Sequence, residues 1–543
     1  MKRKSPVQEA KANGNFWVFG GLLCILLVSI MARDIDRPFT GLHSWAEAHG
    51  AWAARVHCNY GLGYTRGLTT WAVGNPPSKN PQRYFDHPQF GVLLTTASMY
   101  ILGVDESGRR ATKIVVSVIA LLLLLRILRG LTDQKTALLS GLFCVLFPIT
   151  GYFGLADWTM LMGFWAIWCY LVLIQALGIG PEPKTVHKVG LAVSLFLALQ
   201  CGWHGFFYAL AIGVHYGARC ILRRRWPDKS LLAILIVAPL SSLLLSFIVM
   251  AAGHGWDLHR IMELYRWRSA KGEMEQFRWG AWFETFWQHA ATNFTLPVLI
   301  IAIAYLTVGQ LMVFGAAKPP KAHERRERQF PQFWLFIITP VTQLFALKGC
   351  LWKHQTWERP FGPFIAIAAA LGILLLADIL VKVRPWLAKI VAAVLIAIIT
   401  ISCAKGLNHY YSIRHFSPEK VRLFRMLNER IPPDKALLSP MLPIEGLVVQ
   451  QHPVKGAFYR PEVAWYLDRE IVQAATFSEI QKQAQTGRYR YYLVPALQQL
   501  APLINQLQQR YKFESIPADP GGPGRAPMLP YLLFDLYSKA SGG

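Results

Sequence analysis

Long apolar runs separated by short polar turns follow one another up to about residue 404. Several of these runs reach roughly 17–25 residues, the length that a helix needs to cross the hydrocarbon core of a bilayer. Helices satisfy their backbone groups internally, so helices are the elements that this pattern predicts. After a first span that ends near Met31, we expect spans at about 112–130, 137–154, 157–177, 188–202, 203–221, 230–252, 293–315, 332–348, 361–381 and 389–404. The chain is therefore predicted to be an α-helical polytopic membrane protein with about 11 transmembrane helices.

A polar interruption follows the first span and covers residues 33–89. It is rich in aromatic residues and carries the acids Asp34, Asp36, Glu47 and Asp86, together with four histidines. Apolar spans do not need such a loop for stability, whereas chemistry beside a bilayer is commonly placed in loops of this kind. We predict that loop 33–89 forms part of an active site.

The next apolar run, residues 90–104, is too short to be a good span. If it crossed the bilayer, the basic turns at Arg223–Lys229 and Lys318–Arg328 would face outward. If it lies along the surface, these turns stay on the cytoplasmic side, where lysine and arginine are enriched. We therefore predict a juxtamembrane helix at 90–104, a cytoplasmic N-terminus and an extracytoplasmic loop 33–89.

The pattern changes after residue 404. Amphipathic stretches at Pro418–Glu429 and Ala496–Arg510 alternate with strand-like runs such as YRYYLVP and YLLFDLY. This alternation predicts a small soluble α/β domain over residues 405–543 on the extracytoplasmic face. Residues 1–404 would then form the transmembrane catalytic module.

Composition and charge narrow the class of protein. The chain has 543 residues, of which 53% are hydrophobic, and a formal net charge of +25. In a polytopic membrane protein such an excess is explained by basic cytoplasmic turns, so nucleic acid is not an expected partner. The pattern fits an integral membrane protein.

Three short motifs resemble the GT-C superfamily of membrane glycosyltransferases, nearest to the branch of protein O-mannosyltransferases and lipid A aminoarabinose transferases. In HSWAEAHGAWAAR, Glu47 matches the second acid of the family's first-loop signature, while Ala46 replaces the first. Asp86-His87-Pro88 is similar to the element that closes this loop, and Asp157 to an acid at the outer end between two spans. The resemblance implies that His87 lies near the donor phosphate and that Asp86 binds a cation, which would be a divalent metal ion.

Transfer from a lipid-phosphate sugar needs a carboxylate that accepts the proton of the acceptor hydroxyl, and positive charge that stabilises the leaving phosphate. Glu47, Asp36 and Asp157 are the candidate catalytic acids, and Glu47 is the leading candidate base, with Asp34 or Asp36 as alternatives. Asp157 would also cap its helix. We expect Glu47, Asp86 and Asp157 to converge in one pocket.

Positive charge near this pocket is expected from arginines in two outer loops. Arg260, Arg266 and Arg268 alternate with tryptophans, as in the headgroup zone of a bilayer, and Arg359 precedes a span. Guanidinium groups bind phosphate well, although an aromatic belt explains the tryptophans equally. His204 in CGWHGFF is interpreted as a packed or capping residue, and the RRR turn as a topology signal.

Together with these features, the resemblance implies an inverting glycosyltransferase of a bacterial-type inner membrane. Its donor would be a sugar on a polyprenyl phosphate, and its acceptor a hydroxyl of a lipid, glycan or protein at the periplasmic face. A transporter or flippase for lipid-linked substrates is the main alternative, and a polysaccharide ligase or polymerase is a third interpretation. A transporter would place ionisable residues in mid-span, and the spans of this chain are nearly free of them.

Overall fold

The structure is a computed structural model. It describes residues 6–540 except for 80, 85–86, 178–180, 255–258, 260–261, 263–265, 267–268, 270–276, 310–333, 441–449, 453–455, 459 and 518–529. The chain divides into two compact units. Unit 1 contains residues 1–35, 85–98 and 110–412, and unit 2 contains residues 36–84, 99–109 and 413–543. The expected division into 1–404 and 405–543 stays a prediction.

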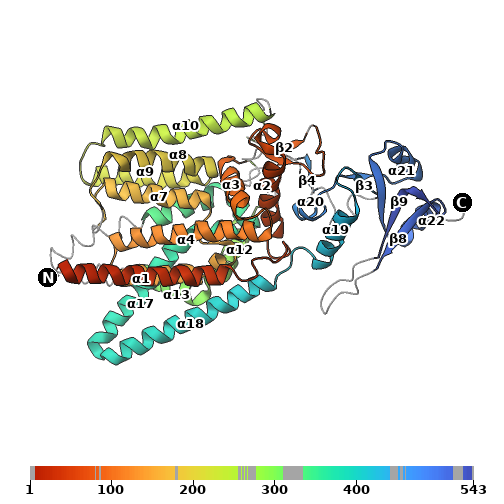
Figure 1. Ribbon diagram of the computed structural model, residues 1–543. Helices are drawn as coiled ribbons and strands as arrows, with labels where there is room; N and C mark the ends of the chain where they lie inside the picture. The colour runs from red at the N-terminus through yellow and green to blue at the C-terminus, as the bar shows by residue number, and fades with distance from the viewer. Residues whose placement is uncertain are drawn as a thin grey trace. The chain divides into compact units, whose positions relative to one another are not determined.

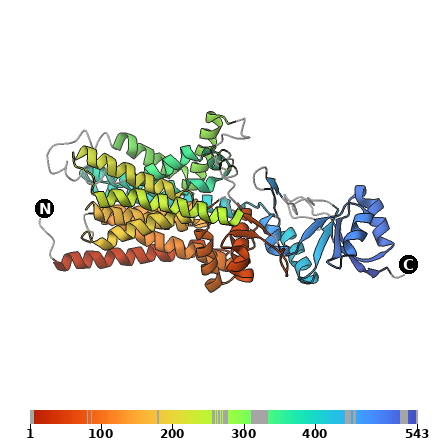
Figure 2. The same ribbon diagram turned by 90° about the horizontal axis from the view of Figure 1, so that it is seen from above.

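Unit 1 is built of helices that run side by side (Figures 1 and 2). Its helices are α1 (Pro6–Met31), α3 (Phe90–Leu102), α4 (Glu106–Leu131), α5 (Gln134–Leu146), α6 (Pro148–Phe153), α7 (Trp158–Leu173), α8 (Thr185–Cys201), α9 (Gly205–Leu222), α10 (Lys229–His254), α12 (Trp279–Phe294), α13 (Leu296–Ala304), the π-helix η1 (Tyr305–Gly309), Trp334–Ala346, α16 (Lys348–Lys353), the 3-10 helix η2 (Gln355–Phe361), α17 (Gly362–Val383) and α18 (Pro385–Ser412); α3 and α4 begin or end in unit 2. Helix α8 packs against α7 and α10, and α17 packs against α5, α13 and α18.

Six helices among the described residues are long and apolar enough to cross a membrane, or seven if the bent pair α12–α13 is one span. The helices α3, α5, α7, α8 and Trp334–Ala346 are apolar but shorter. The protein is thus an integral membrane protein, whereas the predicted count of 11 spans is not confirmed. That α3 lies along the membrane surface also stays a prediction.

Several helices in unit 1 are interrupted by proline or glycine. Pro148 starts α6 directly after the extended residue Phe147, and Pro297 lies in the first turn of α13, after a bend of 104° from α12. Gly202 ends α8, so α8 and α9 form a tight hairpin. Proline lacks the N–H that helix continuation needs, and such breaks expose polar backbone groups. The interruptions place polar side chains beside the ends of α7 and α17.

Unit 2 combines the first loop with the C-terminal part of the chain. Its elements are α2 (Ser44–Thr65), β1 (Thr69–Trp71), β2 (Gln82–Tyr84), α19 (Pro418–Arg430), β3 (Ala436–Ser439), β4 (Gln450–His452), β5 (Gly456–Phe458), α20 (Pro461–Leu467), β6 (Ile471–Gln473), α21 (Phe477–Ala484), β7 (Tyr489–Pro495), the 3-10 helix η3 (Gln498–Leu500), α22 (Ala501–Gln508), β8 (Tyr511–Ile516) and β9 (Tyr531–Lys539). The runs YRYYLVP and YLLFDLY form β7 and β9, as the alternating pattern predicts.

A five-stranded sheet in the order β6-β3-β7-β9-β8 forms the centre of the C-terminal part. Strand β3 is parallel to β6 and β7, and β9 is antiparallel to β7 and β8. Successive side chains of a strand point to opposite faces. Accordingly, Leu437 and Leu493 pack in one core with Trp52 of α2, while Leu438 and Val494 pack in another with α21 and α22. Helices cover both faces of this sheet.

Candidate active site

Asp157 lies at the N-terminal end of α7, in the short turn after α6. Gly154 ends α6 with a φ of +95°, which favours glycine. The Asp157 backbone is extended, and its Oδ1 accepts a hydrogen bond of 2.9 Å from the Met160 backbone N–H. The next residue, Trp158, ties the start of α7 to α3, because its Nε1–H donates a hydrogen bond of 3.2 Å to Thr95 Oγ1. Asp157 is therefore a helix cap with a fixed orientation.

Two basic side chains meet the same carboxylate. Arg359, near the end of η2, places Nη2 2.8 Å from Asp157 Oδ2. His204, in the turn between α8 and α9, places Nε2 3.4 Å from both carboxylate oxygens. The Asp157 side chain is 33% exposed, and those of Arg359 and His204 are 17% and 22% exposed. Three segments that are far apart in the sequence thus form a half-buried polar cluster, which we term the Asp157 cluster.

The electrostatics of this cluster keep Asp157 ionised. Burial by itself raises the pKa of the Asp157 carboxyl. The charges of His204 and Arg359, with hydrogen bonds from His204 and Met160, outweigh burial and bring the pKa well below its usual value. A carboxylate with so low a pKa is a weak base, so Asp157 is suited to holding a cation in place rather than to accepting a proton.

Arg359 is held at two points. Besides the ion pair with Asp157, its Nη1 lies 3.5 Å from the Phe153 carbonyl oxygen, at the end of α6. A guanidinium has five N–H donors in one plane, so further donors remain for an anion. Positively charged donors in a fixed orientation are what a phosphate group requires.

A second polar network lies directly behind Arg359. The neighbouring side chain, Glu358, is fully buried, and its Oε2 accepts a hydrogen bond of 2.9 Å from Asn293 Nδ2 in α12. Asn293 also donates to the Gln355 carbonyl oxygen at 3.1 Å and accepts a hydrogen bond from the Tyr410 hydroxyl of α18. His289 Nδ1 lies 3.7 Å from Glu358 Oε1. This network joins η2, which carries Arg359, to α12 and α18.

Comparisons with known proteins agree on one class. Residues 86–243 match the family model of dolichyl-phosphate-mannose-protein mannosyltransferases. ArnT from Cupriavidus metallidurans, solved with undecaprenyl phosphate, is similar in structure with a TM-score of 0.60, at 12% identity over 97% of this chain and 99% of that chain. The chain resembles the GT-C glycosyltransferases. No curated protein matches the sequence.

Two archaeal structures support the same GT-C fold. The Archaeoglobus fulgidus oligosaccharyltransferase in its apo form has a TM-score of 0.54 at 12% identity, over 92% of this chain and 73% of that chain. AglB from the same organism, in complex with an inhibitory peptide and a dolichol-phosphate, has a TM-score of 0.52 at 11% identity, over 95% and 74%. At such low identity these likenesses establish the GT-C fold of the chain and leave its substrates open.

Two of the predicted first-loop acids, Glu47 and Asp36, lie in unit 2. Glu47 is in the first turn of α2 and only 7% exposed, whereas Asp36 is exposed. Asp157 belongs to unit 1, and Asp86 lies outside the described residues. The predicted convergence of Glu47, Asp86 and Asp157 therefore stays a prediction.

The predicted phosphate-binding residues are placed in part. Arg359 joins Asp157 through their ion pair. His87 is half-buried in unit 1, and Arg266 is exposed. Arg260 and Arg268 lie outside the described residues. No group of three or more His, Cys, Asp or Glu side chains within the described ranges could hold a metal ion, and the divalent metal stays a prediction because Asp86 is not among them.

Sequence reasoning did not single out Glu358, and it interpreted His204 as packing or capping. His204 lies beside a hairpin, as expected, but its ring also faces Asp157. The only signal for Glu358 was a carboxylate next to Arg359 directly before a span. A buried partner such as Asn293, 65 positions away, cannot be found from local sequence.

Proposed function

We propose that this protein is an inverting glycosyltransferase that moves a sugar from a polyprenyl-phosphate donor to a hydroxyl acceptor at the periplasmic face of a bacterial inner membrane. The observation that carries the proposal is the Asp157 cluster, in which a fixed arginine and a histidine face a half-exposed carboxylate at the ends of interrupted helices. The similar ArnT structure contains undecaprenyl phosphate, which supports a lipid phosphate as the ligand.

The proposed reaction uses a carboxylate base for the acceptor and basic side chains for the leaving phosphate. The acceptor oxygen forms a bond to the anomeric carbon while the bond from that carbon to the phosphate oxygen breaks. The acceptor proton passes to a carboxylate base, and polyprenyl phosphate leaves with the electron pair. Arg359 and His204 would stabilise the charge on the leaving phosphate, and Asp157 would hold Arg359 in position. The base would be an acid of the first loop, Glu47 or Asp36, because Asp157 is too acidic for that role.

We also propose that the protein binds a divalent metal ion, with Asp86 as one of the ligands. The metal ion would help Arg359 to neutralise the charge of the phosphate. The acceptor would be a lipid, a glycan or a protein, and an assay of turnover with each class of acceptor identifies which one is used.

The test uses the full-length protein in liposomes that contain a polyprenyl-phosphate sugar and a candidate acceptor. Release of polyprenyl phosphate and transfer of the sugar are measured together for wild type, Arg359→Gln, Asp157→Asn and Glu47→Gln. We expect Arg359→Gln and Glu47→Gln each to lose about 100-fold or more in turnover, the usual cost of removing a charge-stabilising donor or a general base. Asp157→Asn should lose a similar factor, because it releases Arg359 from its fixed position. Arg384→Gln changes an exposed arginine in the turn between α17 and α18 and should keep wild-type activity.

Two results would contradict the proposal. Wild-type turnover in both Arg359→Gln and Asp157→Asn would show that the Asp157 cluster is not the active site. Movement of the lipid-linked sugar across the bilayer without release of polyprenyl phosphate would indicate a flippase instead.

A further inference from the structure

A second polar site lies at the opposite end of the helices from Asp157. A cavity of about 610 Å³ is enclosed by the C-terminal ends of α7 and α9 and the N-terminal parts of α8 and α10. Helix α7 begins beside Asp157 and ends at this cavity, and α9 begins beside His204 and ends there too. The cavity is therefore separated from the Asp157 cluster by the length of α7, roughly 24 Å for its 16 residues.

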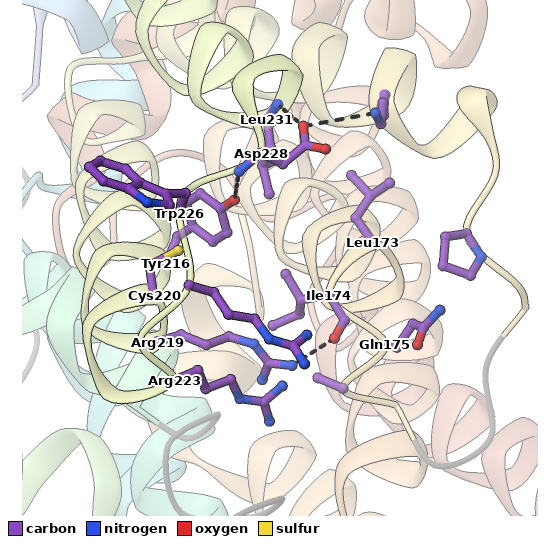
Figure 3. Close-up of a pocket in the computed structure, with 14 residues that line it drawn as sticks. Leu173, Ile174, Gln175, Tyr216, Arg219, Cys220, Arg223, Trp226, Asp228 and Leu231 are labelled. Atoms are coloured by element: carbon purple, nitrogen blue, oxygen red, sulfur yellow. Dashed lines mark hydrogen bonds and ion pairs between the residues drawn. The ribbon is translucent and has the colours of Figure 1, made fainter.

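Basic side chains dominate the polar lining of this cavity. Lys188, Arg219, Arg223 and Arg225 line it, with Asp228 as its one acidic residue. In Figure 3, Arg219 and Arg223 extend side by side, and Asp228 lies across the cavity from them beside Leu231. Four cations thus face one carboxylate.

The single carboxylate is already engaged. Asp228 Oδ1 accepts a hydrogen bond of 2.8 Å from the Leu231 backbone N–H and another from the Ser230 hydroxyl. The ammonium of Lys188 lies 4.0 Å from the same oxygen. These contacts cap α10 and pair Asp228 with Lys188, and within the described part of the chain no ion pair joins Asp228 to Arg219, Arg223 or Arg225.

The arginines have few partners of their own. Arg219 donates from Nη2 to the Ile174 carbonyl oxygen at 2.9 Å, at the end of α7. The side chains of Arg223 and Arg225 make no hydrogen bond or ion pair with any residue that the structure describes, and both lie near enough to repel Arg219. Three guanidinium groups gathered without an anion are electrostatically unfavourable, and a phosphate would remove that cost.

The surroundings indicate where such a phosphate comes from. Trp226, on the rim, is 96% exposed, and Ile221 and Leu222, at the end of α9, are 78% and 80% exposed. Tryptophan beside arginine at the end of membrane spans marks the headgroup level of a bilayer. A large apolar side chain that is fully exposed in a soluble turn is costly, but at the headgroup level it is immersed in lipid.

We propose that this cavity binds the phosphate of an anionic phospholipid from the leaflet opposite the Asp157 cluster. The phosphate would sit between Arg219, Arg223 and Arg225, and the acyl chains would lie against the apolar side chains around Trp226. Because one headgroup would contact the ends of α7, α9 and α10, the bound lipid would stabilise the packing of these helices. This site is independent of the proposed sugar transfer.

The test measures the melting temperature of the purified full-length protein in nanodiscs of phosphatidylcholine, with and without phosphatidylglycerol. We expect phosphatidylglycerol to raise the melting temperature of wild type by several degrees. The double variant Arg223→Gln/Arg225→Gln should lose at least half of that shift while keeping the wild-type melting temperature in phosphatidylcholine alone. Both side chains are exposed, so folding should not depend on them.

The matched control is Lys382→Gln/Arg384→Gln, which removes the same charge from the turn between α17 and α18. Helix α17 starts beside Arg359, so this turn lies at the same membrane end as the cavity but outside it. The control should keep the full lipid shift. An equal loss in both double variants, or no loss in either, would overturn the proposal. Equal protection by soluble glycerol phosphate would also overturn it, in favour of a site for a soluble phosphoester.

Discussion

Asp157 combines two functions in one carboxylate, since Oδ1 caps α7 and Oδ2 holds Arg359. Asp133 offers a comparison within the chain. It caps α5 with nearly the same geometry, accepting a hydrogen bond of 2.9 Å from the Thr136 backbone N–H, but no arginine among the described residues pairs with it. The two residues separate the contribution of capping from that of the ion pair.

We predict that Asp133→Asn costs little stability, because asparagine also caps helices. Asp157→Asn should cost more, because it also removes the ion pair with Arg359. Turnover of the lipid-linked sugar should fall about 100-fold in Asp157→Asn and stay within about twofold of wild type in Asp133→Asn. The measurements are the melting temperature in detergent and the initial rate for both variants. Equal rates in the two variants would show that Arg359 does not need its partner.

A second prediction at this scale concerns pH. The pKa of Asp157 is lower in the folded protein than its ordinary value of 3.8, so the ion pair stabilises the fold fully above that value. This stabilisation is lost only as the pH falls below it toward the folded pKa. His204 is the second titratable group of the cluster, so the comparison is made in a His204→Gln background, where no histidine charge changes. In that background the loss of melting temperature caused by Asp157→Asn should be constant from about pH 8 to pH 5 and shrink below about pH 4. A loss that changes near neutral pH in that background would show that Asp157 is not permanently ionised there.

At the scale of elements, Arg359 meets Asp157 because the 3-10 helix η2 ends beside the start of α7. The Glu358–Asn293–Tyr410 network fixes η2 against α12 and α18, and Asn293 is fully buried at its centre. The position of η2, and with it that of Arg359, depends on this amide.

Replacing Asn293 by Ala would leave Glu358 and Tyr410 without their hydrogen-bond partner. Each buried group left in this way costs about 1–3 kcal/mol, so the variant should melt well below wild type. Tyr410→Phe removes only one of these groups and should cost less. Gln288→Ala, on the exposed side of the same helix α12, should change stability by no more than about 0.5 kcal/mol. A melting temperature of Asn293→Ala equal to that of Gln288→Ala would show that the network contributes nothing.

At the scale of the whole molecule, the direction of α9 relates the two polar sites. Its 18 residues span roughly 27 Å, so the turn at Trp203 and the turn at Arg224 should lie on opposite sides of the membrane. In a background with the eight native cysteines replaced, Trp203→Cys should react with an impermeant maleimide from the periplasmic side. Arg224→Cys should react only after the membrane is permeabilised. Reaction of both from the same side would mean that α9 does not cross.

The sequence predicted the positions of helices and strands better than the breaks within apolar runs and the contacts between distant segments. The apolar runs gave α9, α10 and α17 closely, but α4 and α18 only in their central parts, because α4 begins at Glu106 and α18 ends at Ser412. The alternating runs gave β7 and β9. Helix breaks at Pro148, Gly202 and Pro297 were less visible, because an apolar run continues through each of them.

Asp157 and Arg359 were both selected from the sequence, since an acid or a base at the edge of an apolar run is conspicuous. Their pairing was not predictable, because 202 positions separate them and only tertiary packing brings η2 to the start of α7. The same holds for Glu358 with Asn293. It also holds for the arginines of the RRR turn, which the sequence analysis interpreted as a topology signal and whose cavity it did not predict.

Local chemistry along the chain therefore determined that this protein crosses a membrane and that its last part alternates helix and strand, because hydrophobic periodicity acts over a few neighbouring residues. The packing of distant helices alone decided which charges meet, since an ion pair depends on separation in space and not in sequence. The Asp157 cluster and the basic cavity at the other end of α7 both arise at that level.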